Sequence, residues 1–171
     1  MPLSSTSTRS YRTIRVSFFV LFALSCSLFA LAQTNLTFKL LNGYFLSSDA
    51  PVNKGKPTLF VFEEAGRFHE MFKPATTTSK KPDVPNFSRD MVIGLTTPAT
   101  NKPPILSISR IFVQDSVLTV RYIRLADTSR VTQSFTIQPM LLVSIPKQTV
   151  LKTRLVENGK VVQTIRRNDT E

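Results

Sequence analysis

The sequence has few of the residues that carry most enzyme and cofactor chemistry. Its 171 residues include one cysteine, one histidine and no tryptophan. One cysteine cannot form a disulfide within the chain, and one histidine cannot supply the paired ligands of a zinc helix. No glycine-rich phosphate loop follows a predicted strand. We therefore expect no cofactor, no metal and no catalytic residues, with a hydrolase of unrecognised site as the enzymatic alternative.

The first 32 residues have the three parts of a secretory signal peptide. Three arginines and no acidic residue precede the apolar run 16–24: Arg9, Arg12 and Arg15. The small-x-small motif Ala30-Leu31-Ala32 then precedes Gln33, as at a cleavage site. We predict cleavage between Ala32 and Gln33, export to the periplasm or beyond, and a single β-rich domain at 33–171.

Two alternatives remain open for this segment. Residues 16–32 just reach the length of about 17 residues that a membrane span needs, so the leader could stay as an anchor. Ala23-Leu24-Ser25-Cys26 resembles a bacterial lipobox without its usual leucine. Lipid anchoring through Cys26 is therefore the less favoured alternative to cleavage.

The chain is basic along its whole length. Lys and Arg number 22 against 11 Asp and Glu, a net charge of +11, and loss of the three leader arginines would leave +8. In proteins that bind nucleic acid the cations gather in a patch or along one helix. Here they are scattered singly along the predicted strands, so we expect a basic envelope protein without a nucleic-acid partner.

Residues 105–125 are predicted to form a β-hairpin at the centre of the fold. On the second arm Leu118, Val120 and Tyr122 alternate with polar residues, which is the period of a half-buried strand. On the first arm we expect Leu106, Ile108 and Phe112 to share a face that only Arg110 interrupts. The polar tripeptide Gln114-Asp115-Ser116 is predicted to turn the chain.

The run 58–62, Thr-Leu-Phe-Val-Phe, is predicted to be a strand buried on both faces. One short helix is expected directly after it, at about 63–72. Phe68, Met71 and Phe72 have helical spacing there, and Glu63 and Glu64 would lie in the first turn, where the helix dipole favours acidic residues. His69 is expected on the surface of this helix.

The remaining segments predict further strands. Residues 36–40 alternate as a first strand, and 135–145 form one strand that Pro139 interrupts, because proline cannot donate a ladder hydrogen bond. Asn158-Gly159 predicts a type I′ turn in a C-terminal β-hairpin at 150–167. The pattern indicates a mainly β fold: an antiparallel β-sandwich or curved sheet with one short helix.

Two loops rich in proline are candidate contact surfaces. Residues 74–85 are polar and are interpreted as a solvated loop. Residues 96–104 include a dense polar and proline segment, which we predict to bind a partner because a stiff loop loses little entropy on binding. Its residues are Asn101, Lys102, Pro103 and Pro104. A connection that is stiff only for stability is the alternative.

Several motifs in order resemble the C-terminal domain of PrcB-type proteins. They are a strand followed by the helix ending Met71-Phe72, the segment 86–93 that begins Asn86-Phe87-Ser88 and ends Val92-Ile93, the hairpin arms at 106–112 and 118–122, and the segment 139–146 ending Ile145-Pro146. The resemblance covers about residues 59–146 and implies an exported accessory protein that stabilises a protease complex. Two features depart from the family: Asn86 replaces its usual Asp, and residues 101–104 replace its glycine turn.

These features together predict an exported, non-catalytic protein-binding or accessory module of the bacterial envelope. The expected partner is another envelope or secreted protein, and the resemblance implies a protease. The alternative of another class is a structural envelope protein that associates with itself through strand edges. In that case the terminal hairpin at 150–167 would be the contact.

Overall fold

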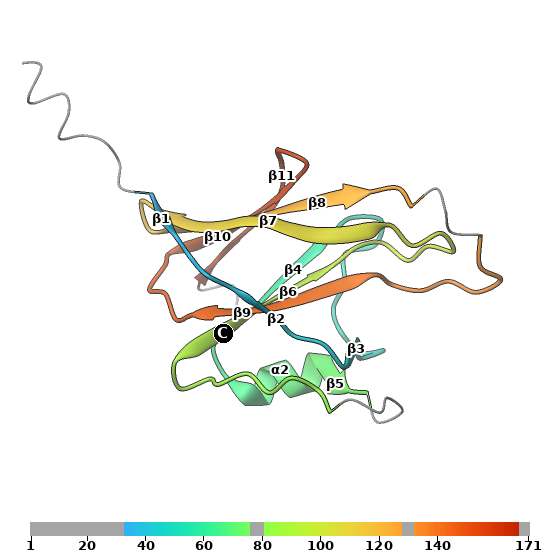
Figure 1. Cartoon of the computed structure of the whole chain (residues 1–171), viewed down its shortest axis with the longest axis horizontal. Coiled ribbons are helices and arrows are strands. Elements are labelled where there is room, and N and C mark those ends of the chain that lie inside the picture. Colours follow the sequence, from blue (N-terminus) through green and yellow to red (C-terminus); the bar gives the residue numbers. More distant parts are fainter. Residues whose placement is uncertain (1–32, 76–80, 128–131, 168–171) are drawn as a thin grey trace, which may run out of the picture. The chain divides into compact units, whose positions relative to one another are not determined.

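The computed structural model describes residues 33–75, 81–127 and 132–167, in which two β-sheets are stacked and a helix covers the far side of the second sheet (Figure 1). The predicted fold class, mainly β in a sandwich with one helix, is confirmed. Residues from Gln33 onward cluster as one compact unit. Ala32, Cys26 and the rest of the predicted leader lie outside the described residues, and so do residues 76–80 of the first loop.

Sheet A has five strands in the order β1-β7-β8-β10-β11. The strands are β1 (Thr34–Asn35), β7 (Ile105–Gln114), β8 (Val117–Leu125), β10 (Lys152–Glu157) and β11 (Lys160–Arg166). Neighbouring strands are antiparallel except for β8 and β10, which are parallel. The parallel pair places the end of β10 beside the end of β8, with Glu157 opposite Tyr122.

Sheet B has four antiparallel strands in the order β2-β9-β6-β4. They are β2 (Lys39–Leu40), β9 (Met140–Pro146), β6 (Asp90–Thr96) and β4 (Thr58–Phe62). A small third layer consists of the helix α2 (Ala65–Met71) and the strand pair β3 (Tyr44–Leu46) and β5 (Phe72–Pro74). The predicted helix is confirmed over a shorter range, with Glu63 and Glu64 before its first turn rather than within it.

Sheet B is buried on both faces, because sheet A covers one face and the helical layer covers the other. Leu59, Ile93 and Val143 belong to the core between the sheets, whereas Phe60 and Val92 pack with Phe68 and Phe72 of the third layer. This explains why β4, β6 and β9 have nearly continuous apolar sequences instead of alternating ones. The prediction for residues 58–62 is confirmed.

The predicted central hairpin is confirmed, with one face assigned wrongly. Leu118, Val120 and Tyr122 face the core as expected. On β7 the pairing register shifts between Ile108 and Arg110, so Ser109 is an extra residue in the ladder. Because of this bulge Ile111 joins Leu106 and Ile108 in the core, and Phe112 lies on the outer face with Arg110.

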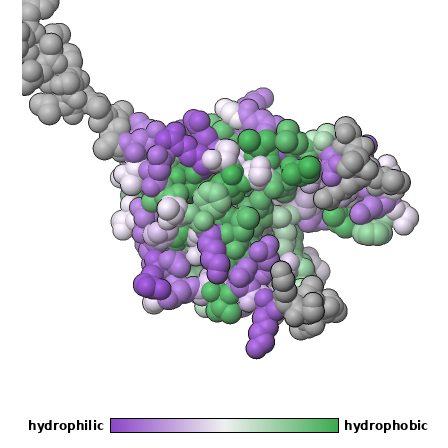
Figure 2. Space-filling view, in the orientation of Figure 1, coloured by the Kyte–Doolittle hydropathy of each residue, from purple (hydrophilic) through white to green (hydrophobic). Residues whose placement is uncertain are grey.

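Two strand predictions need correction. The segment 36–40 is not one strand, because only its last two residues, in β2, pair with sheet B. The strand β1 lies just before it and pairs with sheet A, and the chain crosses from one sheet to the other between them. These short strands leave Phe38 and Leu40 partly exposed, and apolar surface appears among hydrophilic groups on this side (Figure 2).

The strand predicted at 135–145 begins only at Met140, because Pro139 ends the ladder there. Phe135 is exposed and Ile137 makes only an isolated bridge.

The C-terminal hairpin is confirmed. Strands β10 and β11 are joined by Asn158 and Gly159, whose φ angles of 47° and 87° suit a type I′ turn. The hairpin is not a separate appendage, because β10 is an interior strand of sheet A between β8 and β11. Its Leu155 is fully buried in the core between the sheets.

Candidate partner-binding site beside the 101–104 loop

The predicted contact loop is held firmly by backbone hydrogen bonds. Thr100 and Ile137 exchange N–H to O bonds of 2.8 and 2.9 Å, and the N–H of Gln133 donates to the carbonyl of Asn101 at 2.8 Å. The N–H of Lys102 donates to Oγ1 of Thr100 at 3.1 Å. The loop is therefore anchored to the segment before β9 on one side and continues directly into β7 on the other.

The four residues predicted to bind a partner differ in accessibility. Asn101 and Lys102 are exposed, Pro104 is half-buried and Pro103 is buried. Pro103 therefore supports the loop from within, and it is not available as a contact residue. The accessible surface of the loop consists of Asn101, Lys102 and Pro104.

Lys102 and Pro104 line an open hollow of about 270 Å³ at the end of sheet A. The other lining residues come from β8, the chain after it and β10: Arg124, Ala126, Asp127 and Glu157. The hollow forms because the parallel pairing of β8 with β10 brings Arg124 and Glu157 to the same end of sheet A. It therefore presents both cationic and anionic side chains next to a proline.

A network of hydrogen bonds fixes the charged floor of this hollow. The Tyr122 hydroxyl, on a side chain only 1% exposed, donates to Oε2 of Glu157 at 2.6 Å. Arg124 Nη1 lies 3.6 Å from Oε1 of the same carboxylate. Burial, and secondly the hydrogen bond to Glu157, raise the pKa of Tyr122 above its usual value, so the hydroxyl keeps its proton as the donor.

Asn158 ties the hairpin turn to the same network. Its Oδ1 accepts from the N–H of Arg124 at 3.1 Å, and its Nδ2 donates to the carbonyl of Arg124 at 3.2 Å. The turn residue that gives β10 and β11 their connection thus also completes the backbone pairing of β8 near its end. These contacts hold the floor of the hollow in one arrangement, and a preorganised surface loses less entropy on binding.

Exposed aliphatic side chains lie beside the hollow on the outer face of the hairpin. Ile105 follows Pro104 directly and is paired with Leu125, and the two are 46% and 55% exposed. Ile123 is also exposed on this face. Apolar side chains next to a structured polar rim are typical of protein contact surfaces.

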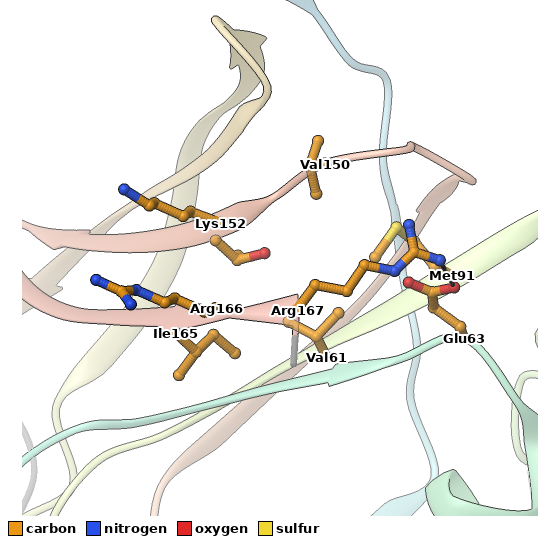
Figure 3. Close-up of a pocket in the computed structure, with 9 residues that line it drawn as sticks. Val61, Glu63, Met91, Val150, Lys152, Ile165, Arg166 and Arg167 are labelled. Carbon is orange, nitrogen blue, oxygen red and sulfur yellow. Dashed lines mark hydrogen bonds and ion pairs between the residues drawn. The ribbon is translucent and has the colours of Figure 1, made fainter. Parts of the chain in front are cut away.

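A second and much smaller cavity lies between the ends of the two sheets (Figure 3). It is lined mainly by Val61, Met91, Val150 and Ile165, and an ion pair of 3.2 Å between Arg167 Nη2 and Glu63 Oε2 lies at its side. Its volume of about 20 Å³ is room for a single water molecule. It is too small to hold a substrate.

Other site chemistry in the described residues is sparse. His69 is exposed on α2, where its nearest ring neighbour is Phe68 at 5.2 Å. Residues 33–75, 81–127 and 132–167 contain no group of three His, Cys, Asp or Glu that could hold a metal ion. In the same ranges no helix is both long and apolar enough to cross a bilayer.

Comparisons of the chain with protein-family models, with curated proteins and with solved structures found no match. The site therefore rests on its own geometry. Lys102 and Pro104 stand out by the composition of their loop. Arg124 and Glu157 give no such signal, because only the parallel pairing of two strands that are distant in sequence brings them together.

Proposed function

We propose that the protein is an exported, non-catalytic binding or accessory module of the bacterial envelope. Its partner contacts the accessible residues of the 101–104 loop and the adjoining hollow. The observation that carries this proposal is the preorganised hollow of Lys102, Pro104, Arg124 and Glu157 beside the exposed pair Ile105 and Leu125.

The charge arrangement supports recognition of a protein rather than of a small molecule. The two charges at the floor, Arg124 and Glu157, are already paired with each other, and Tyr122 takes the second carboxylate oxygen. Lys102 remains as an exposed cation at the rim. A partner would thus gain apolar contact from Ile105 and Leu125 and specificity from a carboxylate placed against Lys102.

A protease is the partner class that the resemblance to PrcB-type proteins suggests. In that family a glycine turn occupies the position of the 101–104 loop of this chain. Asn86, which replaces the family's Asp, still closes the turn before β6, because its Oδ1 accepts from the N–H and the hydroxyl of Ser88 at 3.1 and 2.6 Å. The departure at Asn86 therefore keeps the local turn, and the departure at 101–104 would alter which partner is bound.

The proposal is tested by capture and then by affinity. The tagged protein is used to recover bound proteins from periplasm and culture fluid, and a stoichiometric partner is purified. The double variant Lys102→Glu and Pro104→Ser should then weaken binding of that partner by about tenfold or more, as expected when an interface charge is reversed. Pro103 is left intact because it is buried.

Lys81 and Pro82 offer a matched control, because this exposed lysine and its neighbouring proline lie outside the proposed site. The variant Lys81→Glu and Pro82→Ser changes the net charge by the same amount and should leave the affinity unchanged. Equal weakening by both variants, or no stoichiometric partner at all, would contradict the proposal.

A further inference from the structure

The outer face of sheet A gathers basic side chains from all four of its long strands. This face is opposite to the one on which Leu118, Val120 and Tyr122 enter the core. The residues that it carries are Arg110 on β7, Arg121 on β8, Lys152 and Arg154 on β10, and Arg166 on β11. The alternation of the terminal hairpin puts Lys152, Arg154 and Arg166 on one side, and the strand order of sheet A adds Arg110 and Arg121 to them.

Arg110 and Arg121 are held next to each other in the middle of this face. They are directly opposite in the β7–β8 ladder. Their guanidinium carbons lie 5.2 and 5.4 Å from the ring centroid of Phe112, and Nε of Arg110 donates to Oδ1 of Asn35 at 2.7 Å. The aromatic ring offsets part of the repulsion between the like charges and fixes both guanidinium groups in place.

In the part of the chain that the structure describes, the strands of this face place cations, and no carboxylate, at their outward positions. The strand positions of β7, β8, β10 and β11 that point outward include no Asp or Glu, and Glu157 lies on the other side with Tyr122. Lys152 and Arg166 are directly opposite in the β10–β11 ladder, and at the end of the sheet they also line the small cavity near Glu63 (Figure 3). Cations gathered on one face raise the local positive potential, which attracts an anionic surface.

The aliphatic residues Ile123 and Leu125 continue the row of outward positions on β8 beyond Arg121. The face thus changes from cationic to apolar toward the end of the hairpin. A ligand that carries only phosphate or carboxylate groups would make no apolar contact with Ile123 and Leu125. A bilayer surface takes both, because headgroups attract the cations and the interface accepts aliphatic side chains.

We propose that the outer face of sheet A docks on an anionic membrane surface, with lipid phosphates bound at Arg110 and Arg121. The guanidinium fork matches a phosphate with two parallel hydrogen bonds. An acidic protein is the competing occupant. The uniform sign of the face favours a bilayer, because protein surfaces mix charges of both signs whereas an anionic leaflet does not. This face shares the exposed Leu125 with the proposed partner site, but its charged residues are different, since the partner site uses Lys102 and the membrane face uses Arg110 and Arg121.

The test uses the protein as the producing cell processes it, sedimented with lipid vesicles. Vesicles that mix phosphatidylglycerol with phosphatidylcholine should bind it, and binding should fall as salt is raised. Vesicles of phosphatidylcholine alone should not. The double variant Arg110→Gln and Arg121→Gln should weaken binding by about tenfold, since each cation near an anionic surface contributes to affinity.

The matched control removes two cations from the opposite layer. Arg67→Gln and Lys73→Gln, on α2 and β5, change the net charge equally and should leave vesicle binding intact. If the Arg110 and Arg121 variant does not fold, as judged by its circular dichroism and melting, then Lys152→Gln and Arg154→Gln replaces it and should weaken binding in the same way.

Three outcomes would overturn the inference. Equal binding to neutral and anionic vesicles would indicate attachment by an apolar segment. Equal loss in both double variants would indicate an effect of net charge without a site. Capture by immobilised polyglutamate, without capture by vesicles, would assign the face to an acidic protein. Lys102→Glu should reduce vesicle binding no more than Lys81→Glu does. Partner binding and vesicle binding are therefore tested by different substitutions, and either proposal can be contradicted without the other.

Discussion

Gln163 of β11 accepts a hydrogen bond from the backbone N–H of Leu59 in β4 through its side-chain oxygen, at 2.8 Å. Strand β4 is an edge of sheet B and β11 is an edge of sheet A. One side chain therefore satisfies a backbone donor that an edge strand would otherwise leave open, and it links the two sheets. Unpaired edge groups are templates for association with other chains, so this contact protects the edge. It also makes the terminal hairpin a weaker candidate for self-association.

We expect Gln163→Ala to lower the free energy of unfolding by about 1 to 2 kcal/mol, because a partly buried N–H loses its acceptor. The variant should also associate more readily at high concentration. Chemical denaturation and light scattering measure the two effects. Gln163→Glu keeps an acceptor oxygen and should recover most of the stability. If Gln163→Ala is as stable as the exposed control Thr164→Ala, the link has no energetic role.

Gly94 in β6 lies under the Phe72 ring, and this close approach predicts a steric effect. A Cβ at position 94 would be 3.1 Å from Cε2 and Cζ of Phe72 and 3.2 Å from Cδ2 of Leu142. Gly94→Ala should therefore destabilise the protein by about 1 to 3 kcal/mol, as overpacked cores do. Thermal melting gives the change.

The control for Gly94 is Gly66 in α2, around which a Cβ would meet no atom within 4 Å. Gly66→Ala should stabilise the helix by up to about 1 kcal/mol because alanine has the higher helix propensity. The two glycine variants should thus shift the melting temperature in opposite directions. A shift of the same sign in both would contradict the packing described for Gly94.

The buried Tyr122 predicts a dependence of stability on alkaline pH. Its pKa is raised by burial and by the hydrogen bond to Glu157. Because the folded state holds this proton more tightly than the unfolded state, its contribution is complete below the ordinary tyrosine pKa of about 10 and declines as pH rises above that value. Tyr122→Phe should cost about 1 to 2 kcal/mol at neutral pH, since Glu157 loses a donor.

The same variant should lose less stability than the natural protein between neutral and strongly alkaline pH. Urea denaturation at both pH values measures this difference. Tyr44 is a useful comparison, because burial and the nearby Asp83 also raise its pKa, whereas its hydroxyl donates to the backbone carbonyl of Asp83 at 2.7 Å. If Tyr122→Phe loses as much free energy of unfolding between neutral and alkaline pH as the natural protein does, then groups other than Tyr122 cause that loss.

Much of the fold could be predicted from local patterns. The alternation of Leu118, Val120 and Tyr122, the apolar run at 58–62 and the Asn158-Gly159 turn each specify local structure that packing then keeps. The bulge at Ser109 could not be predicted, since it depends on the pairing of β7 with β8 and leaves no turn residue as a signal. For that reason Phe112 was assigned to the wrong face.

The candidate site was less predictable than the fold. The composition of residues 101–104 stands out in the sequence, but it does not show which of them are buried. Pro103 is buried and supports the loop from within. Arg124 and Glu157 meet only because β10 runs parallel to β8 across a long connection. The basic face was predictable only in part: alternation along the terminal hairpin already places Lys152, Arg154 and Arg166 on one side, whereas Arg110 and Arg121 join them only through the strand order of sheet A.

The turn of the β7–β8 hairpin predicts a stabilising substitution. Asp115 and Ser116 have positive φ angles of 51° and 58°, a left-handed backbone that costs most residues with a Cβ about 1 to 2 kcal/mol. Glycine adopts this conformation without strain, so Ser116→Gly should stabilise the protein by about 0.5 to 1 kcal/mol after its larger loss of entropy on folding. The second hairpin already has glycine at the equivalent position, and Gly159→Ser should destabilise it. Equilibrium denaturation of the two variants should give changes of opposite sign, and a destabilising Ser116→Gly would mean that the Ser116 side chain has a stabilising contact of its own.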